Sequence, residues 1–271
     1  MGVLALTNGT ELNVALGGRA DLSGDDPVVV LVHGAAMDRT VWQMQTRYLA
    51  FHGYRVIALD LPGHGGTPGE LPATVEEYAT WLAATLEALP VDGPVHLGGH
   101  SLGSFVALEV AAQRPELVAG LLLFGIAEAM PVHPKLLEAA EANDPLAGQL
   151  MSGWALATDS KVGAHPSPGG SMVGGTQALI ERADPGVLAN DLKASSGYSR
   201  ALDAARKVTA PTTVILGAND KMTPVRAAAP LLDALREGGA EVTEVVIPNC
   251  GHMMTLEAPD QLRSILKTAL P

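Results

Sequence analysis

Three residues of this chain have side chains that could together perform nucleophilic catalysis: Ser101, Asp220 and His252. Each lies a few positions beyond the end of a predicted strand. A serine hydroxyl becomes a good nucleophile only when a base removes its proton, and that base needs a third group to orient it. His252 and Asp220 are the candidates for the base and the orienting acid. These residue types therefore predict acyl transfer through Ser101.

Ser101 lies between two glycines in the sequence Gly-His-Ser-Leu-Gly at positions 99–103. A short apolar segment precedes this pattern and a helix-like segment follows it, which is the context that a nucleophile elbow requires. In such a turn the backbone of the serine is strained, and side chains at the two glycine positions would collide. The pattern therefore predicts a serine hydroxyl exposed at the end of a strand.

Alternating strands and helices would bring the three residues together. Apolar, often β-branched runs predict strands, and capping residues, prolines and glycines mark the helix ends. The expected strands are 11–16, 28–32, 55–59, a short strand before Ser101, 118–124, 212–216 and 241–247. The first expected helix begins at Asp38 or Thr40 and ends at Gly53. The other expected helices span 74–89, 104–114, 224–236 and 257–269. This order predicts a mostly parallel sheet that binds its ligand at the carboxyl ends of the strands.

The alternation stops between Gly125 and Arg206. Helix-like pieces at 134–142, 177–182 and 187–198 are separated by Gly-, Pro- and Ser-rich stretches such as 165–171. We interpret residues 126–206 as a cap or lid insertion over the edge of the sheet, with 1–125 and 207–271 as the core. An irregular crossover with no role in the site is the alternative.

Composition excludes several classes of protein. The chain has 271 residues, of which 47% are hydrophobic and 17% are charged, and its net charge is −12. This acidity argues against nucleic acid and anionic membranes as partners. A single cysteine, Cys250, allows no internal disulfide. With no signal-like N-terminus and no apolar run of about 18 residues, we expect a cytoplasmic protein that is a monomer or a homodimer.

Five motifs together resemble the α/β-hydrolase superfamily over nearly the whole chain outside the insertion. They are His33-Gly34, the segment 60–65 (Asp-Leu-Pro-Gly-His-Gly), the pattern at 99–103, Asn219-Asp220 and Gly251-His252. The resemblance implies an α/β fold with a mostly parallel sheet of about eight strands, flanked by helices and carrying a cap. Ser, Asp, His is also the chain order of the triad in that superfamily.

The resemblance also implies roles for single residues. Ser101 matches the nucleophile, His252 the general base and Asp220 the acid that holds the imidazole. The backbone amides of Ala35 and Leu102 match the oxyanion hole. No cofactor is implied, and no cluster of residues suggests a metal site, because His96 and His100 lie on a strand and a turn rather than on one helical face.

Several residues keep alternative interpretations. Glu128 is a rival for the orienting acid, because some members of the superfamily carry it after the strand that ends here at Phe124. His33 and His64 are expected to shape loops by hydrogen bonding, Asp60 to be structural and Cys250 to be a small buried residue. Candidates for contacts with the substrate are His100, Trp154, Met222 and Met253.

The predicted function is hydrolysis of a small carboxylic ester through an acyl-enzyme. A thioester, a lactone or a carbon–carbon bond could be cleaved with the same residues. The carbon–carbon alternative is weakened by Met253, because hydrolases of that kind with this fold typically carry tryptophan after the catalytic histidine. A non-catalytic ligand-binding protein is the alternative from another class, and it is disfavoured because all three members of the triad are present.

Overall fold

The fold is built on a twisted sheet of eight strands. The computed structural model describes residues 2–19, 22–163 and 169–271. The strands lie in the order β1-β2-β4-β3-β5-β6-β7-β8, and β3 to β8 pair in parallel, whereas β1 and β2 pair antiparallel. They span Gly2–Ala5 (β1), Glu11–Ala15 (β2), Val28–Val32 (β3), Arg55–Leu59 (β4), Val95–His100 (β5), Val118–Phe124 (β6), Thr212–Gly217 (β7) and Val242–Ile247 (β8). The predicted fold class is confirmed.

The first strand, β1, is an addition to the strands expected from sequence. It forms a hairpin with β2, in which Gly2 pairs with Val14 and Ala5 with Glu11. Its side chains are mostly exposed or half-buried. A strand at the edge of a sheet needs no continuous apolar run, so the pattern used for the central strands could not reveal it.

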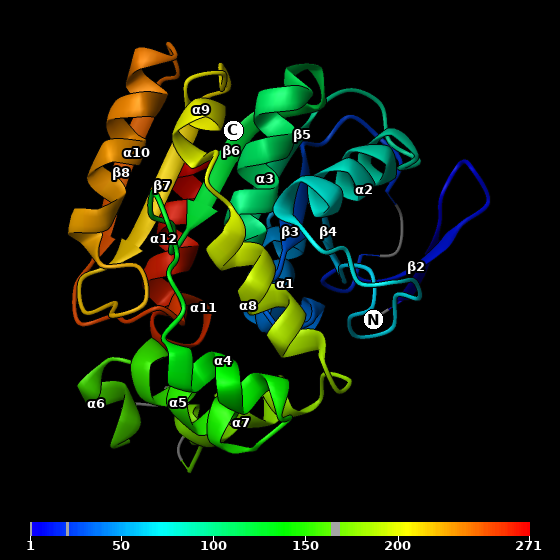
Figure 1. Ribbon diagram of the computed structural model, residues 1–271. Helices are drawn as coiled ribbons and strands as arrows, with labels where there is room; N and C mark the ends of the chain where they lie inside the picture. Colours follow the sequence, from blue (N-terminus) through cyan, green and yellow to red (C-terminus); the bar gives the residue numbers. More distant parts are fainter. Residues whose placement is uncertain (1, 20–21, 164–168) are drawn as a thin grey trace.

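The central strands bury both faces of the sheet. Along β3, Val28, Val30 and Val32 belong to one apolar core, whereas Val29 and Leu31 belong to the other. The first core is completed mainly by α2 (Val75–Glu87), α3 (Leu102–Gln113) and α10 (Val225–Glu237), and the second by α1 (Gln43–Phe51) and α12 (Pro259–Ala269). Helices therefore cover the sheet on both sides (Figure 1). This alternation is why the strand reads as one unbroken apolar run in the sequence.

Helix ends follow the capping residues of the sequence closely. Thr74 accepts a hydrogen bond from the amide of Glu77, whose carboxylate accepts one from the amide of Ala73, and α2 begins at the next residue after Thr74. Asp38 caps a short 3₁₀ helix, Arg39–Trp42, before α1 begins. The core helices are α1 (Gln43–Phe51), α2 (Val75–Glu87), α3 (Leu102–Gln113), the 3₁₀ turn Pro115–Leu117, α9 (Ala201–Ala205), α10 (Val225–Glu237), α11 (Met254–Glu257) and α12 (Pro259–Ala269).

A group of helices lies between β6 and β7 in the sequence and across one end of the sheet in Figure 1. Apolar side chains from these helices form a third, separate core around Leu136, Met151 and Ile180. These helices are α4 (Pro134–Glu141), α5 (Leu146–Ala155), α6 (Thr158–Lys161), α7 (Met172–Glu181) and α8 (Val187–Gly197). The fold therefore contains a helical insertion with its own packing.

Details of the insertion differ from the sequence expectation. Helix α7 begins at Met172 rather than Gln177, because the hydroxyl of Ser171 caps it by accepting from the amide of Gly174. Part of the Gly/Pro/Ser stretch at 165–171 lies outside the described residues. The short helix α9 packs against α3 and α10 rather than against the helices of the insertion. The bounds 126–206 stay a prediction.

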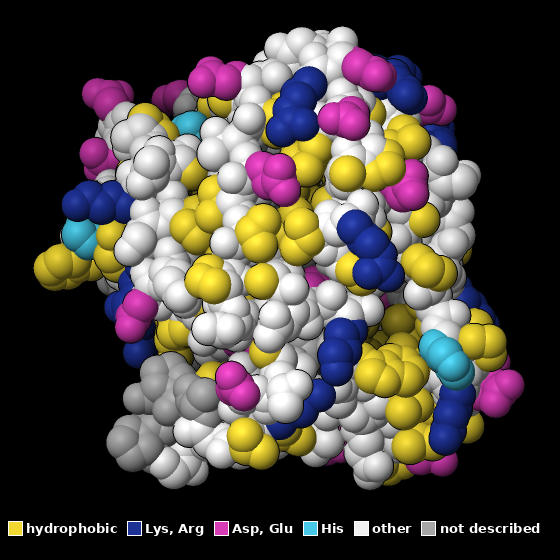
Figure 2. Space-filling view, turned by 90° about the vertical axis from the view of Figure 1, so that its left-hand side faces the viewer, with side chains coloured by type: hydrophobic (Ala, Val, Ile, Leu, Met, Phe, Trp, Pro, Cys, Tyr) yellow, Lys and Arg dark blue, Asp and Glu magenta, His cyan; other side chains and the backbone are white. Residues whose placement is uncertain are grey.

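None of the helices in the described residues is both long and apolar enough to cross a membrane. On the face seen in Figure 2, acidic and basic side chains are interspersed, and hydrophobic side chains gather at the lower right, in the part of the view occupied by the insertion.

Two fully buried histidines lie at the ends of the central strands. His33 follows β3; its Nδ1 donates to the carbonyl of Gly34 at 2.8 Å and its Nε2 accepts from the amide of Leu61 at 3.0 Å. His100 ends β5, and its Nε2 lies 2.9 Å from the carbonyl oxygen of His252. Burial, reinforced by a neighbouring imidazole, lowers the pKa of His33 to about 4 and that of His100 to about 3. Both rings are therefore neutral in the folded protein near neutral pH.

These histidines predict that the fold loses stability in mild acid. Because their folded pKa values lie below the ordinary value near 6.5, the unfolded chain binds more protons as the pH falls below about 6.5. Each ring then costs about 2–3 kcal/mol by pH 4.5, from about 1.4 kcal/mol per pKa unit. Urea unfolding at pH 7.0 and 4.5 should show this fall in the free energy of unfolding.

Two variants make the stability test specific. His100→Gln should remove about half of the fall in the free energy of unfolding, because His33 remains, whereas the same change at the exposed His52 should leave the fall as in the unchanged protein. An equal pH dependence in all three proteins would contradict the assignment of the acid sensitivity to the buried ring.

Candidate active site

Ser101 occupies a strained turn between β5 and α3. Its backbone has φ 54° and ψ −118°, a conformation that costs a non-glycine residue on the order of 1–3 kcal/mol. A Cβ on Gly99 would lie 2.0 Å from the carbonyl oxygen of Gly103, and one on Gly103 would lie 2.4 Å from that of His33. Both positions therefore exclude any side chain, as the sequence pattern predicted.

Hydrogen bonds hold this turn in place from the neighbouring strand. The amide of Ser101 donates to the carbonyl oxygen of Phe124 at 2.9 Å. The hydroxyl of Ser104 contacts the carbonyl oxygens of Gly99 at 2.6 Å and Phe124 at 2.8 Å. These contacts join the elbow to the end of β6 and offset the strain at Ser101.

Asp220 and His252 lie in direct contact. The Nδ1 of His252 is 2.7 Å from Oδ2 of Asp220, and both side chains are buried. Asp220 follows β7 and His252 follows β8, so neighbouring parallel strands deliver the two groups to one edge of the sheet. The carboxylate thereby fixes the ring with its Nε2 atom on the opposite side.

Thr223 completes the surroundings of the carboxylate. Its hydroxyl donates to Oδ2 of Asp220 at 2.6 Å, while the amides of Met222 and Thr223 donate to Oδ1 at 2.8 and 2.9 Å. Burial works to raise the pKa of Asp220, but its interaction and hydrogen bond with the His252 ring and the hydrogen bonds from Thr223 outweigh burial and hold that pKa well below its ordinary value. Asp220 is therefore ionised and positioned before any substrate binds.

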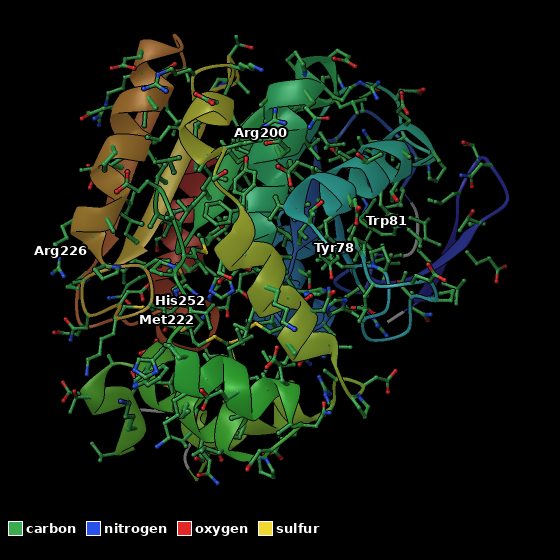
Figure 3. All side chains as sticks on the ribbon, in the orientation of Figure 1. Tyr78, Trp81, Arg200, Met222, Arg226 and His252 are labelled. Carbon is green, nitrogen blue, oxygen red and sulfur yellow. The ribbon has the colours of Figure 1, made fainter. Side chains whose placement is uncertain are left out.

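The loop that carries His252 is held on both sides of the ring. One carboxylate oxygen of Glu257 accepts from the amides of Gly251 and Met253, each at 3.1 Å. The other accepts from the amide of Ala157 at 2.8 Å, which ties the loop to the segment that follows α5. The amide of His252 also donates to the carbonyl oxygen of Ala155 at 2.6 Å. Figure 3 shows His252 and Met222 between the sheet and the insertion.

Nε2 of His252 is buried and has no hydrogen-bond partner within the described residues. His252 and Ser101 line the same cavity. Hydrogen bonds between a catalytic serine and its base are often long in proteins without substrate, so this arrangement is compatible with a proton transfer between them.

Leu102 directly follows Ser101, and Ala35 lies on the loop after β3 that packs against the elbow. Leu102 is the first residue of α3, where backbone amides have no acceptor inside the helix. Gly34 brings the loop after β3 against the elbow, since a Cβ there would lie only 3.2 Å from Cβ of Ser101. Ala35 lines the same cavity as Ser101. The structure thus brings both predicted amide donors to the neighbourhood of the hydroxyl.

A cavity of about 370 Å³ opens beside Ser101 and His252. Its lining is largely apolar and comes mostly from the segment after β6 and from the insertion. Trp154, Met222 and Met253, which were predicted to contact a substrate, all line it; its other apolar residues include Met130, Leu136, Met151, Ile180 and Leu192. The size and lining suit a small apolar acyl group.

The fourth predicted substrate contact, His100, does not lie among the residues that line this cavity. Its ring is fully buried behind His252, where it contacts the backbone carbonyl of that residue. His100 is the last residue of β5, and its ring packs 4.8 Å from that of His252 instead of on the cavity wall.

Other sequence candidates are resolved by their contacts. Glu128 is exposed and is not among the partners of His252, whereas Asp220 is. Asp60 is buried, pairs with Arg39 and accepts from the amide of Gly66 at 3.0 Å, which is a structural arrangement. Burial raises the pKa of the Cys250 thiol well above its ordinary value, so that thiol is not a reactive nucleophile.

Sequence reasoning missed three residues that hold the site: Thr223, Glu257 and Asp191. The spacing of Asp220 and Thr223, three positions apart after a strand, is typical of a side chain bonding to a turn and could have indicated Thr223. Buried Asp191 and half-buried Glu257 lie in helices, and each bonds to partners far away in sequence. No local pattern distinguishes them.

Comparisons with known proteins agree with the fold. Residues 29–265 match the model of the "Alpha/beta hydrolase family". The chain is 32% identical over 259 residues to a pimeloyl-[acyl-carrier protein] methyl ester esterase of Aromatoleum aromaticum, covering 89% of this chain and 97% of that protein. It is 26% identical over 258 residues to an (E)-2-((N-methylformamido)methylene)succinate hydrolase of Acinetobacter baylyi, covering 91% of each.

A solved structure is similar over almost the whole length. A thermophilic esterase from Thermogutta terrifontis superposes with a TM-score of 0.80 at 25% sequence identity, covering 98% of this chain and 96% of that one. The family match covers the parallel strands from Val29 of β3 through β8, the insertion and all the candidate site residues. The chain belongs to the α/β-hydrolase family.

Proposed function

We propose that this protein hydrolyses small carboxylic esters with Ser101 as nucleophile, His252 as general base and Asp220 as the orienting acid. The observation that carries the proposal is the contact of 2.7 Å between His252 and Asp220, with Ser101 and His252 on one apolar cavity. The similarity to a methyl ester esterase and to a thermophilic esterase supports an ester as substrate.

In the proposed reaction, the Oγ atom of Ser101 attacks the ester carbonyl while Nε2 of His252 takes the hydroxyl proton. The carbonyl oxygen becomes an oxyanion that accepts hydrogen bonds from the amides of Ala35 and Leu102. Collapse of this intermediate breaks the bond to the alcohol, which leaves with the proton from His252. Water activated by His252 then attacks the acyl-enzyme and releases the acid and free Ser101.

The cap role of the insertion is part of the same proposal. Residues of α4, α5, α7 and α8 supply much of the cavity wall, so the insertion decides which acyl groups fit. A thioester or a lactone would present the same carbonyl to Ser101. We therefore expect apolar contacts to recognise the acyl side of the substrate. Whether an ester, a thioester or a lactone bond is cleaved would depend on which of these carbonyl groups reaches Ser101.

Substrate profiling tests the function. A panel of p-nitrophenyl esters from acetate to decanoate should be hydrolysed, with kcat/KM highest for acyl chains that fill about 370 Å³. Ser101→Ala should reduce the rate to that of the uncatalysed reaction plus the small acceleration that substrate binding alone provides. If no ester is cleaved, or if the variant stays active, the chain is instead a binding protein or a hydrolase with another nucleophile.

Replacing the acid distinguishes the two sequence candidates. Asp220→Asn should lower kcat by about 10³–10⁴-fold, because the amide favours the wrong tautomer of His252. Glu128→Gln is the matched control, and kcat should remain unchanged because Glu128 is exposed and does not contact the ring. A large loss with Glu128→Gln and none with Asp220→Asn would show that the orienting acid is assigned wrongly.

Truncation of a cavity wall tests the acyl pocket. Trp154→Ala should raise KM for a hexanoate ester about tenfold, since removal of part of the indole contact costs about 1–3 kcal/mol. Trp81→Ala is the control, because Trp81 is also half-buried but lies on α2, away from His252 and Met222 (Figure 3). Equal effects of the two variants on KM would indicate that Trp154 acts through general stability rather than through contact with the acyl chain.

A further inference from the structure

Asp191, on α8 of the insertion, is a fully buried carboxylate that accepts hydrogen bonds from three separate parts of the core. Its Oδ2 atom accepts from the amide of Ala36 at 2.8 Å and lies 2.8 Å from Nε2 of His64. Its Oδ1 atom accepts from the hydroxyl of Tyr78 at 2.7 Å. The donors belong to the loop after β3, the loop after β4 and helix α2. One side chain therefore joins the insertion to the loop that carries Ala35.

The peptide that Asp191 holds is strained. Ala36 has a φ of 52°, a left-handed conformation that is uncommon for residues other than glycine and is unfavourable by about 1 kcal/mol or more. Its amide points at Asp191, while the next amide, that of Met37, donates back to the carbonyl oxygen of Gly34 at 3.2 Å. Because Ala35 directly precedes this residue, the direction of the Ala35 amide depends on how Ala36 is held.

The imidazole of His64 also faces the carboxylate of Asp191. Its Nδ1 atom lies 2.9 Å from the carbonyl oxygen of Pro62, and its Nε2 atom faces Asp191. Both neighbours are acceptors, so the ring satisfies both only when each nitrogen carries a proton. Burial lowers the pKa of His64, but the hydrogen bond and charge of Asp191 outweigh burial and raise that pKa above its ordinary value.

The surroundings keep this pair in one geometry. The ring of His33 packs against that of His64 with centroids 5.0 Å apart, and Tyr78 presents its hydroxyl from α2 (Figure 3). Asp60, which pairs with Arg39, adds a second negative charge near both rings. A buried ion pair is a poor source of net stability, because removing both charges from water costs about as much as their attraction returns. Its geometric effect on Ala36 offers a reason for its presence.

We propose that Asp191 is a positioning residue through which the insertion completes the oxyanion hole, by holding the Ala35–Ala36 peptide with the Ala35 amide directed at the reacting carbonyl. The inference rests on the proposed function of Ser101. It gives the insertion a second role besides lining the cavity: the core alone would carry the nucleophile and its base, but a poorly ordered oxyanion donor.

The proposal predicts a loss in kcat with little change in KM. Asp191→Ala should lower kcat about 10²-fold, because one misplaced oxyanion donor costs about 10²–10³ in rate, while KM should change less than about twofold. The affinity for a trifluoromethyl ketone, which forms a tetrahedral adduct with the serine, should fall by a similar factor. The affinity for the matching methyl ketone should stay the same. Asp191→Asn should recover part of kcat, because its amide oxygen can still accept from Ala36.

Glu109 supplies the matched control. Its carboxylate is likewise buried and accepts from a tyrosine, Tyr198, at 2.5 Å, but it lies on α3 away from the loop of Ala36. Glu109→Ala should lower thermal stability as Asp191→Ala does and leave kcat and the affinity for the trifluoromethyl ketone unchanged. Equal kinetic losses in the two variants would overturn the proposal, because they would show an effect of stability alone.

Hydrogen exchange separates this inference from the proposed function. The peptide covering residues 33–41 should exchange faster in Asp191→Ala than in the unchanged protein, and Glu109→Ala should not show this change. Unchanged exchange in Asp191→Ala would overturn the proposal whatever the activity. Faster exchange in a protein that cleaves none of the test esters would confirm that Asp191 holds the loop while refuting the ester hydrolase function.

Discussion

The close approach of two backbones, at the elbow of Ser101 and the loop after β3, governs the whole candidate site. Gly103 lies so near the carbonyl oxygens of Val32 and His33 that no Cβ fits between them, and Gly34 lies almost as near to Ser101. This contact sets the distance between the serine hydroxyl and the amides that could hold an oxyanion. The parallel pairing of β3 with β5 makes it possible, because both strands end at the same edge of the sheet.

Around this contact the protein uses buried polar groups rather than apolar packing. His33 and His100 are kept neutral by burial; His33 holds its loop through both ring nitrogens, and His100 contacts the carbonyl oxygen of His252 through Nε2. By contrast, the carboxylates of Asp220 and Asp191 each accept hydrogen bonds from several donors. An unpartnered buried polar group is costly, so each of these networks favours one arrangement of its loop over the alternatives. That rigidity is what a site built on loops needs in order to hold groups within a fraction of an ångström.

The insertion contacts this site in more than one way. It lines the cavity, it receives the amide of His252 on the carbonyl of Ala155, and it contributes Asp191 to the loop of Ala36. In addition, the carboxylate of Glu257, on the helix after the His252 loop, accepts a hydrogen bond from the segment after α5. The helices that line the cavity are thus bonded to the loops that carry His252 and the candidate oxyanion donor. Changes in the insertion are expected to alter turnover as well as substrate preference.

Local sequence was sufficient for much of this architecture. The β-branched run at Val28–Val32, the glycines around Ser101 and the capping box at Thr74 each depend on neighbours within a few residues, and the strands and helices formed where these patterns indicated. The order of Ser101, Asp220 and His252 at strand ends was enough to expect that they meet, because parallel strands end at one edge.

Contacts between distant residues could be seen only in the tertiary structure. Asp191 meets Tyr78 across 113 positions and His64 across 127, and His100 turns toward the His252 carbonyl 152 positions away instead of toward the cavity. Nothing in the neighbouring sequence of these residues distinguishes a buried hydrogen-bonded side chain from a solvated one. The sequence by itself therefore determined the fold and the candidate reacting groups, whose signals are local. The tertiary structure decided the shape of the cavity and the residues that hold the loops, because those properties arise from packing between segments far apart in the chain.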